Sequence, residues 1–541
     1  MASREPKERP IAPAALARAR AGLAAARGRR RLDLILDARD PEALVRALPA
    51  DELWFTIRDI GLADAADLVQ LASADQFKVF LDLEAWSKEG FDSARALAWL
   101  RAARAGSDLE PRAAARWERK LSSIDAEVLY LTLRRSLRVH DLDENPDPEI
   151  ASDRFMRSPE GKFVIEFLVD GAEYVAVRGL LDDLYAEDPF RAARLLSSTR
   201  WESPSELEES ALRWRTGRLA DLGFPSTEEA LSWFARPPPG PAAPAGAPDR
   251  PPGFFLAEFE HGALLDRAAA RLADADREAL EQQLVAAANA VLVADAVDPG
   301  DPEAVRAAIQ GARALVELGL EARAGTDEGA AAAALAEAPL KRTFQEGFGR
   351  VLELKWRAER ILREGGAGTR EAPLLDAPVG EALAALVARR PRYFPGLEAP
   401  REEWATPAAG AETARHFLSS QELARTAAAL DLAAALASLA RDLGLAAPPG
   451  APIAPRLSAL YLTARANELL GRPFAPAPIA AAELPAATAA LGGAGLDPRL
   501  ASRGEPGAVL AEWAGRRLDE LRAAPEGAAV RPELVTALLV H

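Results

Sequence analysis

Residues 40–61, with the sequence DPEALVRALPADELWFTIRDIG, decide the fold of this chain. Apolar residues recur there three and four positions apart, in two short blocks that are separated by Leu48-Pro49 and closed by Gly61. This spacing places an apolar stripe along one face of a helix, and proline and glycine interrupt helices. The stripe consists of Leu44, Val45, Leu48, Leu53, Ile57 and Ile60. The segment therefore predicts two short helices that each bury one face.

The same pattern extends over the surrounding residues, from Leu32 to Leu100. A second buried face is predicted from Leu68, Val69, Leu71, Phe77, Phe80, Leu81 and Leu83. A short amphipathic helix buries its apolar stripe only by stacking on its neighbours. We therefore expect a mainly α protein that begins with stacked short helices in an α-superhelical, repeat-like arrangement and continues as an Ala-rich helical region.

A four-residue pattern occurs at four places: an acidic residue, an aliphatic residue, glycine and a large apolar residue. Its copies are Asp59–Leu62, Asp221–Phe224, Glu317–Leu320 and Asp442–Leu445. Glycine readily adopts the left-handed conformation that ends many helices, and the next apolar side chain then folds back on the last turn. We predict a helix end at each copy.

One segment has the pattern of β structure. Large apolar residues occupy alternate positions from Phe163 to Val169, Asp170-Gly171 follows, and Tyr174 to Val177 form a second apolar run. An Asp-Gly pair between such runs favours a tight hairpin turn. The sequence therefore predicts a small β-hairpin near residues 162–178, with a buried helix pair as the alternative.

Proline-rich stretches divide the chain. Residues 237–253 contain eight prolines and no aromatic or aliphatic side chain larger than alanine, so they bury too little surface to offset the entropy of ordering. The predicted organisation is a basic arm (1–31), a helical-repeat-like domain (32–236), a Pro-rich linker (237–253), a helical domain (254–364), a connector (365–378) and an Ala/Pro-rich helical region (379–541).

The composition argues against several classes of function. The 541 residues include no cysteine and four histidines, none close to another, so thiolate chemistry, Cys-containing zinc sites and local His-rich metal motifs are excluded or disfavoured. The formal charge is −16; residues 1–31 carry nine basic and two acidic side chains, so the remaining chain carries −23. Because that charge repels phosphate backbones, it disfavours nucleic-acid binding.

The sequence also bears on location. It contains no uncharged apolar stretch of the roughly 18 residues that a membrane-spanning helix needs, and its start lacks the pattern of a secretory signal. The absence of cysteine fits a reducing compartment. We expect a cytoplasmic protein without a membrane span.

An acidic stretch after His140 is the candidate metal site. Taking Asp141 as position one of a calcium loop places oxygen-bearing side chains at alternate positions. The candidate ligands are Asp141, Asp143, Asn145, Asp147 and Glu149. Pro146 stands where an EF-hand needs glycine and Ser152 where it needs glutamate, so we predict at most a loose Mg²⁺ or Ca²⁺ contact, with a solvated acidic loop as the alternative.

Three segments resemble a bacterial family of uncharacterised proteins, over most of the chain. They are the 40–100 block with Leu53, Trp54, Gly61, Asp64–Leu68, Gln76 and Trp86; Ser158–Phe163; and Asn289 with Val293–Asp295. More distantly, residues 40–100 resemble the helical N domain of MgtE-type magnesium transporters. That second resemblance implies an α-superhelical fold and makes Mg²⁺ worth testing, but it implies no transport.

The sequence contains no phosphate-binding loop, dinucleotide fingerprint or nucleophile elbow. We therefore expect a non-enzymatic interaction or scaffold protein that binds a protein partner, because stacked helices present extended surfaces. One alternative is a regulatory module that responds to divalent cations, and another is an enzyme whose Asp, Glu and Arg residues come from distant segments. A pocket with convergent Asp, Arg and Tyr would favour the enzyme, and an apolar groove rimmed by charge would favour the scaffold.

Overall fold

The computed structural model describes residues 28–87, 90–201, 203–221, 223–236, 263–298, 301–406, 408–447, 455–495, 497–523 and 536–541, together with 19, 22, 23 and 26. These residues form two compact units. Unit 1 holds the described residues through Trp233 and from Leu272 to Ile309, and unit 2 holds those within 234–236, 263–271 and 310–541. The predicted linker, 237–253, and most of the basic arm, 1–31, lie outside the described residues.

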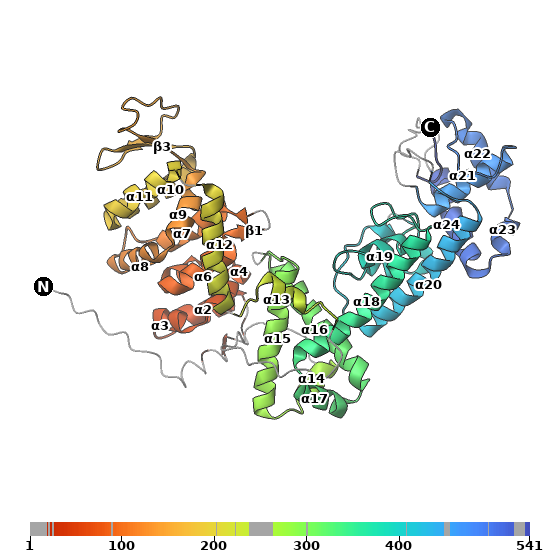
Figure 1. Cartoon of the computed structure of the whole chain (residues 1–541), viewed down its shortest axis with the longest axis horizontal. Helices are drawn as coiled ribbons and strands as arrows, with labels where there is room; N and C mark the ends of the chain where they lie inside the picture. Colours follow the sequence, from red (N-terminus) through yellow and green to blue (C-terminus); the bar gives the residue numbers. More distant parts are fainter. Residues whose placement is uncertain are drawn as a thin grey trace. The chain divides into compact units, whose positions relative to one another are not determined.

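Unit 1 begins with short helices that stack in a regular way. They are α2 (Gly28–Leu36), α3 (Pro41–Ala47), α4 (Ala50–Ile60), α5 (Ala66–Leu71), α6 (Ala74–Glu84), α7 (Ser93–Arg104), α8 (Pro111–Ser123) and α9 (Ala126–Arg134). Each helix from α2 to α7 packs on the helix two places further along the chain, and Figure 1 shows the resulting stack. The predicted mainly α fold of stacked short helices is confirmed.

The core of this stack is built from the predicted apolar faces. Leu53, Trp54, Ile57, Phe77 and Phe80 are all fully buried. Burying a large apolar side chain stabilises a fold by about 1.5–3 kcal/mol, so these faces are sufficient reason for the short helices to stack. Capping fixes their ends: in α6, for example, the Ser73 and Gln76 side chains satisfy each other's backbone N–H groups.

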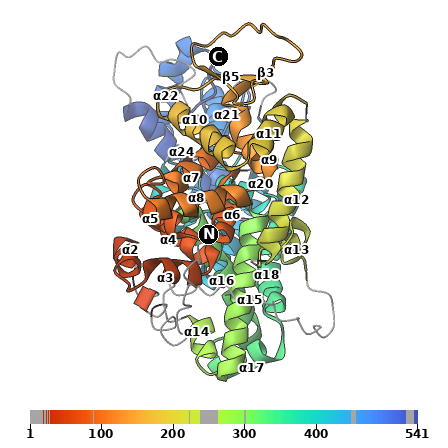
Figure 2. The same ribbon diagram turned by 90° about the vertical axis from the view of Figure 1, so that its left-hand side faces the viewer.

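A small antiparallel sheet follows the stack. Its strands are β3 (Leu137–Asp141), β4 (Phe155–Arg157) and β5 (Phe163–Phe167), in the order β3-β5-β4. A separate sheet pairs two strands of two residues each, β1 (Trp86–Ser87) and β2 (Gly90–Phe91). Val139 and Met156 both face Ile165 of the central strand. In Figure 2, β3 and β5 lie above α10 (Gly171–Glu187) and α11 (Pro189–Trp201).

Of the predicted hairpin near residues 162–178, the first strand is confirmed and the second is wrong. Residues 163–167 form a strand, but both of its partners precede it, and Gly171 begins α10 with a positive φ of 54°. The second apolar run is the start of a helical stripe, because Val177, Leu180, Leu181 and Leu184 are buried along one face. Alternation over four residues did not distinguish this stripe from a strand.

The remaining helices of unit 1 extend along and beside the stack. They are α12 (Pro204–Asp221), α13 (Thr227–Ser232), α15 (Asp274–Ala294) and the first residues of α16 (Pro302–Ala324). Helix α12 packs against α6 and α9, and α13 packs against α15. Asn289 of α15 is buried and donates from Nδ2 to the Gly223 carbonyl at 3.0 Å, which ties α15 to the end of α12.

Unit 2 is also helical. Its α-helices are α14 (Leu264–Ala269), the rest of α16, α17 (Glu328–Glu337), α18 (Leu340–Glu364), α19 (Val379–Leu386), α20 (Ser420–Asp442), α21 (Leu457–Leu469), α22 (Leu484–Gly493), α23 (Pro498–Ala501) and α24 (Gly504–Ala523). The 3₁₀ helices are η2 (Pro395–Glu398), η3 (Arg401–Glu403), η4 (Ala408–Gly410) and η5 (Ala481–Glu483). Helix α20 packs against α18, α19 and α24, and α24 also packs against α21, α22 and α23.

The predicted helix ends have mixed outcomes. Gly223 and Gly444 have positive φ, and the apolar residue after each donates back across the last turn of α12 and α20, as predicted. Gly61 follows the last residue of α4. Gly319 was wrongly predicted, because it lies inside α16, where a Cβ would overlap the Thr343 carbonyl oxygen of α18. Its lack of a side chain serves close helix packing.

Two further segments bear on the predicted organisation and on membranes. In the predicted connector 365–378, Asp376 is fully buried and accepts hydrogen bonds from the Ser458 N–H at 2.9 Å and hydroxyl at 2.5 Å, at the start of α21. Burial raises the Asp376 pKa, and these hydrogen bonds oppose that rise.

Within the described residues, α20 alone is long and apolar enough to cross a membrane. Of its most apolar stretch of 18 residues, 56% is buried inside the protein, as in the core helix of a soluble protein. Helix α20 therefore does not establish whether the chain spans a membrane.

Candidate functional site

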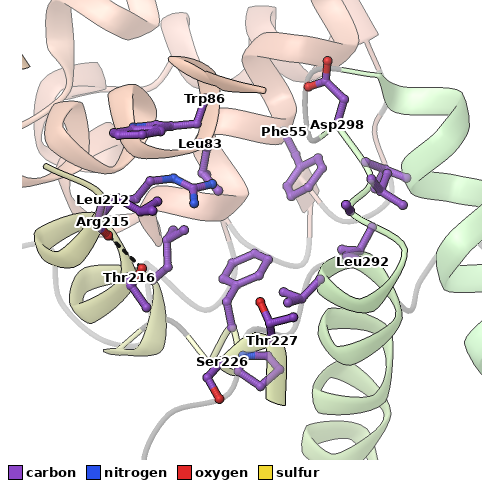
Figure 3. Close-up of a pocket in the computed structure, with 17 residues that line it drawn as sticks. Phe55, Leu83, Trp86, Leu212, Arg215, Thr216, Ser226, Thr227, Leu292 and Asp298 are labelled. Atoms are coloured by element: carbon purple, nitrogen blue, oxygen red, sulfur yellow. Dashed lines mark hydrogen bonds between the residues drawn. The ribbon is translucent and has the colours of Figure 1, made fainter. Parts of the chain in front are cut away.

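An apolar pocket of about 280 Å³ lies within unit 1 (Figure 3). Its walls come from α4, α6, β1, α12, the turn before α13, the end of α15 and the start of α16. The largest apolar contributors are Phe55, Leu83, Trp86, Leu212, Phe224 and Leu292. A concave apolar site with few polar groups is the usual form of a binding pocket, so we treat this one as the candidate site.

Arg215 of α12 brings the positive charge to this pocket. Its Nε donates to the backbone carbonyl of Asp82 at 2.6 Å, and its guanidinium carbon lies 5.6 Å from the centre of the Trp86 ring. Figure 3 shows the guanidinium beneath that ring and directed into the pocket. Burial lowers the pKa of Arg215, and the charge of Asp82 opposes the shift. A guanidinium still remains protonated near neutral pH.

The carboxylate of Asp82 is already engaged by a different arginine. Asp82 is 2% exposed and accepts from Nε and Nη2 of Arg218 at 2.5 and 2.9 Å. Arg218 also lies 2.8 Å from a carboxylate oxygen of Asp125. Burial raises the pKa of Asp82, and Arg218 opposes the shift. These ion pairs fix α12 against α6 and leave Arg215 without a carboxylate contact among the described residues.

A second group of charges closes the opposite side of the pocket. Arg95 donates to both carboxylate oxygens of Asp298, at 3.0 and 2.8 Å, and Asp298 lines the pocket. Glu84 is buried beside them and accepts from Trp54 Nε1 at 3.2 Å and from Arg58 at 3.0 Å. Burial raises the pKa of Glu84, while Arg58 and Arg95 oppose the shift. The acidic groups on this side are therefore all paired.

The turn that carries Asp298 has an unusual backbone. Helix α15 ends in a Schellman motif in which Val297 N–H donates to the Leu292 carbonyl and Ala296 N–H to the Val293 carbonyl, at 3.0 and 3.1 Å. Ala296 occupies the position normally held by glycine, with φ of 47°. All four of these residues line the pocket, so the strained turn shapes its wall.

The start of α13 forms the rim. Ser226 and Glu229 make a capping box, since Ser226 Oγ accepts from Glu229 N–H and Glu229 accepts from Ser226 N–H. Thr227, the next residue, is exposed, and Figure 3 shows its hydroxyl directed towards the pocket. A larger side chain at Thr227 would enter the pocket.

Another buried charge of unit 1 lies away from the pocket. Lys120 of α8 is 1% exposed, and its Nζ donates to the Gln70 carbonyl at 2.9 Å, in the last turn of α5. Burial lowers the Lys120 pKa to about 7, and the charges of Arg116 and Arg46 act in the same direction. The amine therefore completes the end of α5, and near neutral pH it is only partly protonated.

The five predicted metal ligands lie in one loop but do not converge. Asp141 is buried at the end of β3, whereas Asp143, Asn145, Asp147 and Glu149 are exposed. Asp143 N–H donates to Asp141 Oδ1 and Asp147 N–H to Asn145 Oδ1. The Lys162 ammonium lies 3.7 Å from carboxylate oxygens of Asp141 and Asp143.

The far end of this loop is held by protein groups. Glu166 of β5 is 1% exposed and accepts from the N–H groups of Ala151 and Ser152 at 3.0 and 2.7 Å. Across the residues that the structure describes, no three His, Asp or Glu side chains form a group able to hold a metal ion. Cation binding by the loop stays a prediction.

Together these features define a mainly α-helical protein with an apolar pocket that one arginine borders. The family model of a family of unknown function, DUF6178, matches residues 8–522, and the chain belongs to that family. No curated protein and no solved structure matches the chain. The predicted membership of a family of unknown function is confirmed, whereas the likeness to magnesium transporters finds no support.

Proposed function

We propose that this protein is an intracellular interaction protein without catalytic activity, and that the pocket of unit 1 receives a large apolar side chain of a partner protein. The observation that carries the proposal is the pocket wall. Phe55, Trp86 and Phe224 supply aromatic surface, and the acidic groups beside it are engaged in ion pairs. Apolar pockets of this kind accept the anchor residues that dominate protein interfaces.

The rim favours a protein as the occupant over a small molecule. Leu212 of α12 lines the pocket and is still 42% exposed, so the pocket has an apolar wall that is open to solvent. A small molecule inside the pocket would leave that surface in water, whereas a partner chain would cover it. Exposed apolar surface next to a pocket is typical of interaction sites.

The charge distribution supports binding over catalysis. The charged side chains that line the pocket are Arg215 and Asp298, and Asp298 is held by Arg95. No tyrosine or histidine is among the described lining residues. An apolar site rimmed by paired charges has the composition expected of an interaction surface.

A selection experiment with a matched pair of variants tests the proposal. Random peptides displayed on phage are selected against the full-length protein, and the enriched peptides are tested against Thr227→Trp and Glu228→Trp. Thr227→Trp fills the pocket from an exposed rim position, whereas Glu228 is the neighbouring exposed residue and lines no part of it.

We expect enriched peptides to contain an aromatic or branched aliphatic residue, and to lose binding to Thr227→Trp but not to Glu228→Trp. Enriched peptides that bind both variants as tightly as the unmodified protein would place the interaction elsewhere. A selection that enriches no peptide sensitive to Thr227→Trp would refute the proposal.

A further inference from the structure

We propose that the pocket recognises the C-terminal carboxylate of a partner chain that ends in a large apolar residue, and that Arg215 pairs with this carboxylate. The inference rests on the proposed function, because it names the chemical group that accompanies the apolar side chain into the pocket. Three features of Arg215 and its surroundings carry it.

The first feature is the unused hydrogen-bonding capacity of Arg215. Its Nε donates to the Asp82 carbonyl, but its two terminal amino groups have no hydrogen-bond partner among the described residues. Arg218, one helical turn further along α12, takes the Asp82 carboxylate with two hydrogen bonds. Of two arginines that contact the same residue, one is therefore satisfied by the fold and the other is free to bind a ligand.

The second feature is the fixed orientation of the free groups. The hydrogen bond to the Asp82 carbonyl and the position under the Trp86 ring restrain the guanidinium at two places. Figure 3 shows that it extends from α12 into the pocket. A guanidinium presents its N–H groups in a planar fork that matches the two oxygens of a carboxylate. A restrained fork loses little entropy on binding such a group.

The third feature is the charge of the pocket wall. Asp298, the acidic residue of the lining, is paired with Arg95 through two hydrogen bonds. Arg215 is the other charged residue of the lining and has no carboxylate partner there. An incoming anion therefore meets a guanidinium whose terminal groups contact no carboxylate and whose charge the nearby Asp82, already paired with Arg218, offsets only in part, whereas an incoming cation would meet repulsion.

The position of Arg215 within an apolar wall selects a C-terminal carboxylate over the side chain of an internal acidic residue. Trp86 and Leu212 flank the guanidinium in the lining. A ligand must therefore place an apolar group and an anion close together. In a C-terminal residue the side chain and the carboxylate share one Cα, so both reach their partners from a single residue.

Synthetic peptides that differ in one group test the inference on the full-length protein. Each peptide ends in 4-fluorophenylalanine or leucine, either as the free acid or as the amide, and a third version carries an internal glutamate with an amidated end. Affinities are measured by isothermal titration calorimetry for the unmodified protein, Arg215→Met, Arg213→Met and Thr227→Trp. Arg213 is the matched control, because it is exposed on the same helix and pairs with Glu209 outside the pocket.

We expect the free acid to bind roughly 10- to 100-fold more tightly than the amide, as for a hydrogen bond to a charged group. Arg215→Met should remove the preference for the free acid over the amide, whereas Arg213→Met should keep it. Equal affinity of acid and amide would overturn the inference but leave the proposed function intact, provided that Thr227→Trp abolishes binding of both.

Other outcomes also decide the matter. Binding of the internal-glutamate peptide as tight as that of the free acid would overturn the assignment to a C-terminus. Decanoate, titrated in the same way, serves as a small molecule that combines an apolar chain with a carboxylate. If it binds more tightly than every peptide, the assignment of the occupant to a partner chain is overturned. Peptides that bind Thr227→Trp and the unmodified protein equally would contradict the proposed function itself.

Discussion

The crossing of α16 and α18 allows the sharpest prediction of stability. A Cβ at Gly347 would overlap the Leu315 carbonyl oxygen and lie 2.9 Å from the Gly319 nitrogen, inside the about 3.5–4.0 Å of a favourable contact. Gly347→Ala must therefore push the two helices apart. Overpacking costs about 1–3 kcal/mol, and the upper part of that range applies here because the overlapping atoms are backbone and cannot rotate away; this cost exceeds the roughly 1 kcal/mol that alanine gains over glycine in a helix.

Gly349 provides the control on the same helix. A Cβ there would meet no atom within 4 Å, so Gly349→Ala keeps the helix gain of about 0.8–1.0 kcal/mol without a clash. The two variants are compared by thermal unfolding, where 1 kcal/mol corresponds to about 2–4 °C for a unit of this size. We expect Gly347→Ala to unfold at a lower temperature than the unmodified protein and Gly349→Ala at a higher one. Shifts in the same direction would refute the close crossing of the two helices.

Three further predictions concern unit 1. Ala296→Gly should raise the free energy of unfolding by about 1 kcal/mol in urea titrations, because it relieves a left-handed backbone; an unchanged or lower value would contradict the strain. Burial lowers the pKa of Lys120 to about 7 in the fold, so as the pH rises from 7 towards 10 the folded chain loses this proton while the unfolded chain keeps it, and stability rises with pH. Relative to Lys120→Met, the unmodified protein should gain up to about 1.4 kcal/mol per pH unit in urea titrations from pH 7 to 9, and a constant difference would refute the shift. Cation binding by loop 141–149 requires that millimolar Mg²⁺ or Ca²⁺ raises the unfolding temperature beyond matched NaCl, and that Asp143→Asn with Asp147→Asn removes the difference; no shift would end that hypothesis.

Much of the fold could be predicted because local patterns decide it. The apolar spacing of Leu53 and Ile57 determines which face of α4 is buried whatever the neighbouring helix is. Gly444 ends α20 because its left-handed conformation and the apolar Leu445 after it are local properties. Gly319 stands in the same four-residue pattern but lies inside α16, because the backbone of α18 fills the space where a side chain would be. That reason lies in a helix distant in sequence.

The pocket could not be predicted for the same physical reason. Its wall combines residues from 55–86, 212–227 and 292–305, and no spacing in the sequence indicates that these segments meet. Arg215 carried a weak signal, since it lies between Leu212 and Leu219 on the apolar stripe of α12. A charged residue on such a stripe indicates either a buried ion pair or a ligand-binding group. The two cases are distinguished only in the structure, where Arg218 takes the Asp82 carboxylate and Arg215 donates to the Asp82 carbonyl instead.

The affinity of a selected peptide for Thr227→Trp, measured beside Glu228→Trp, tests the central claim most directly. If the pocket of unit 1 holds an apolar side chain of a partner, Thr227→Trp weakens binding at least tenfold and Glu228→Trp leaves it within twofold, at about 1.4 kcal/mol per factor of ten. Equal affinity of the two variants for every selected peptide would contradict the claim.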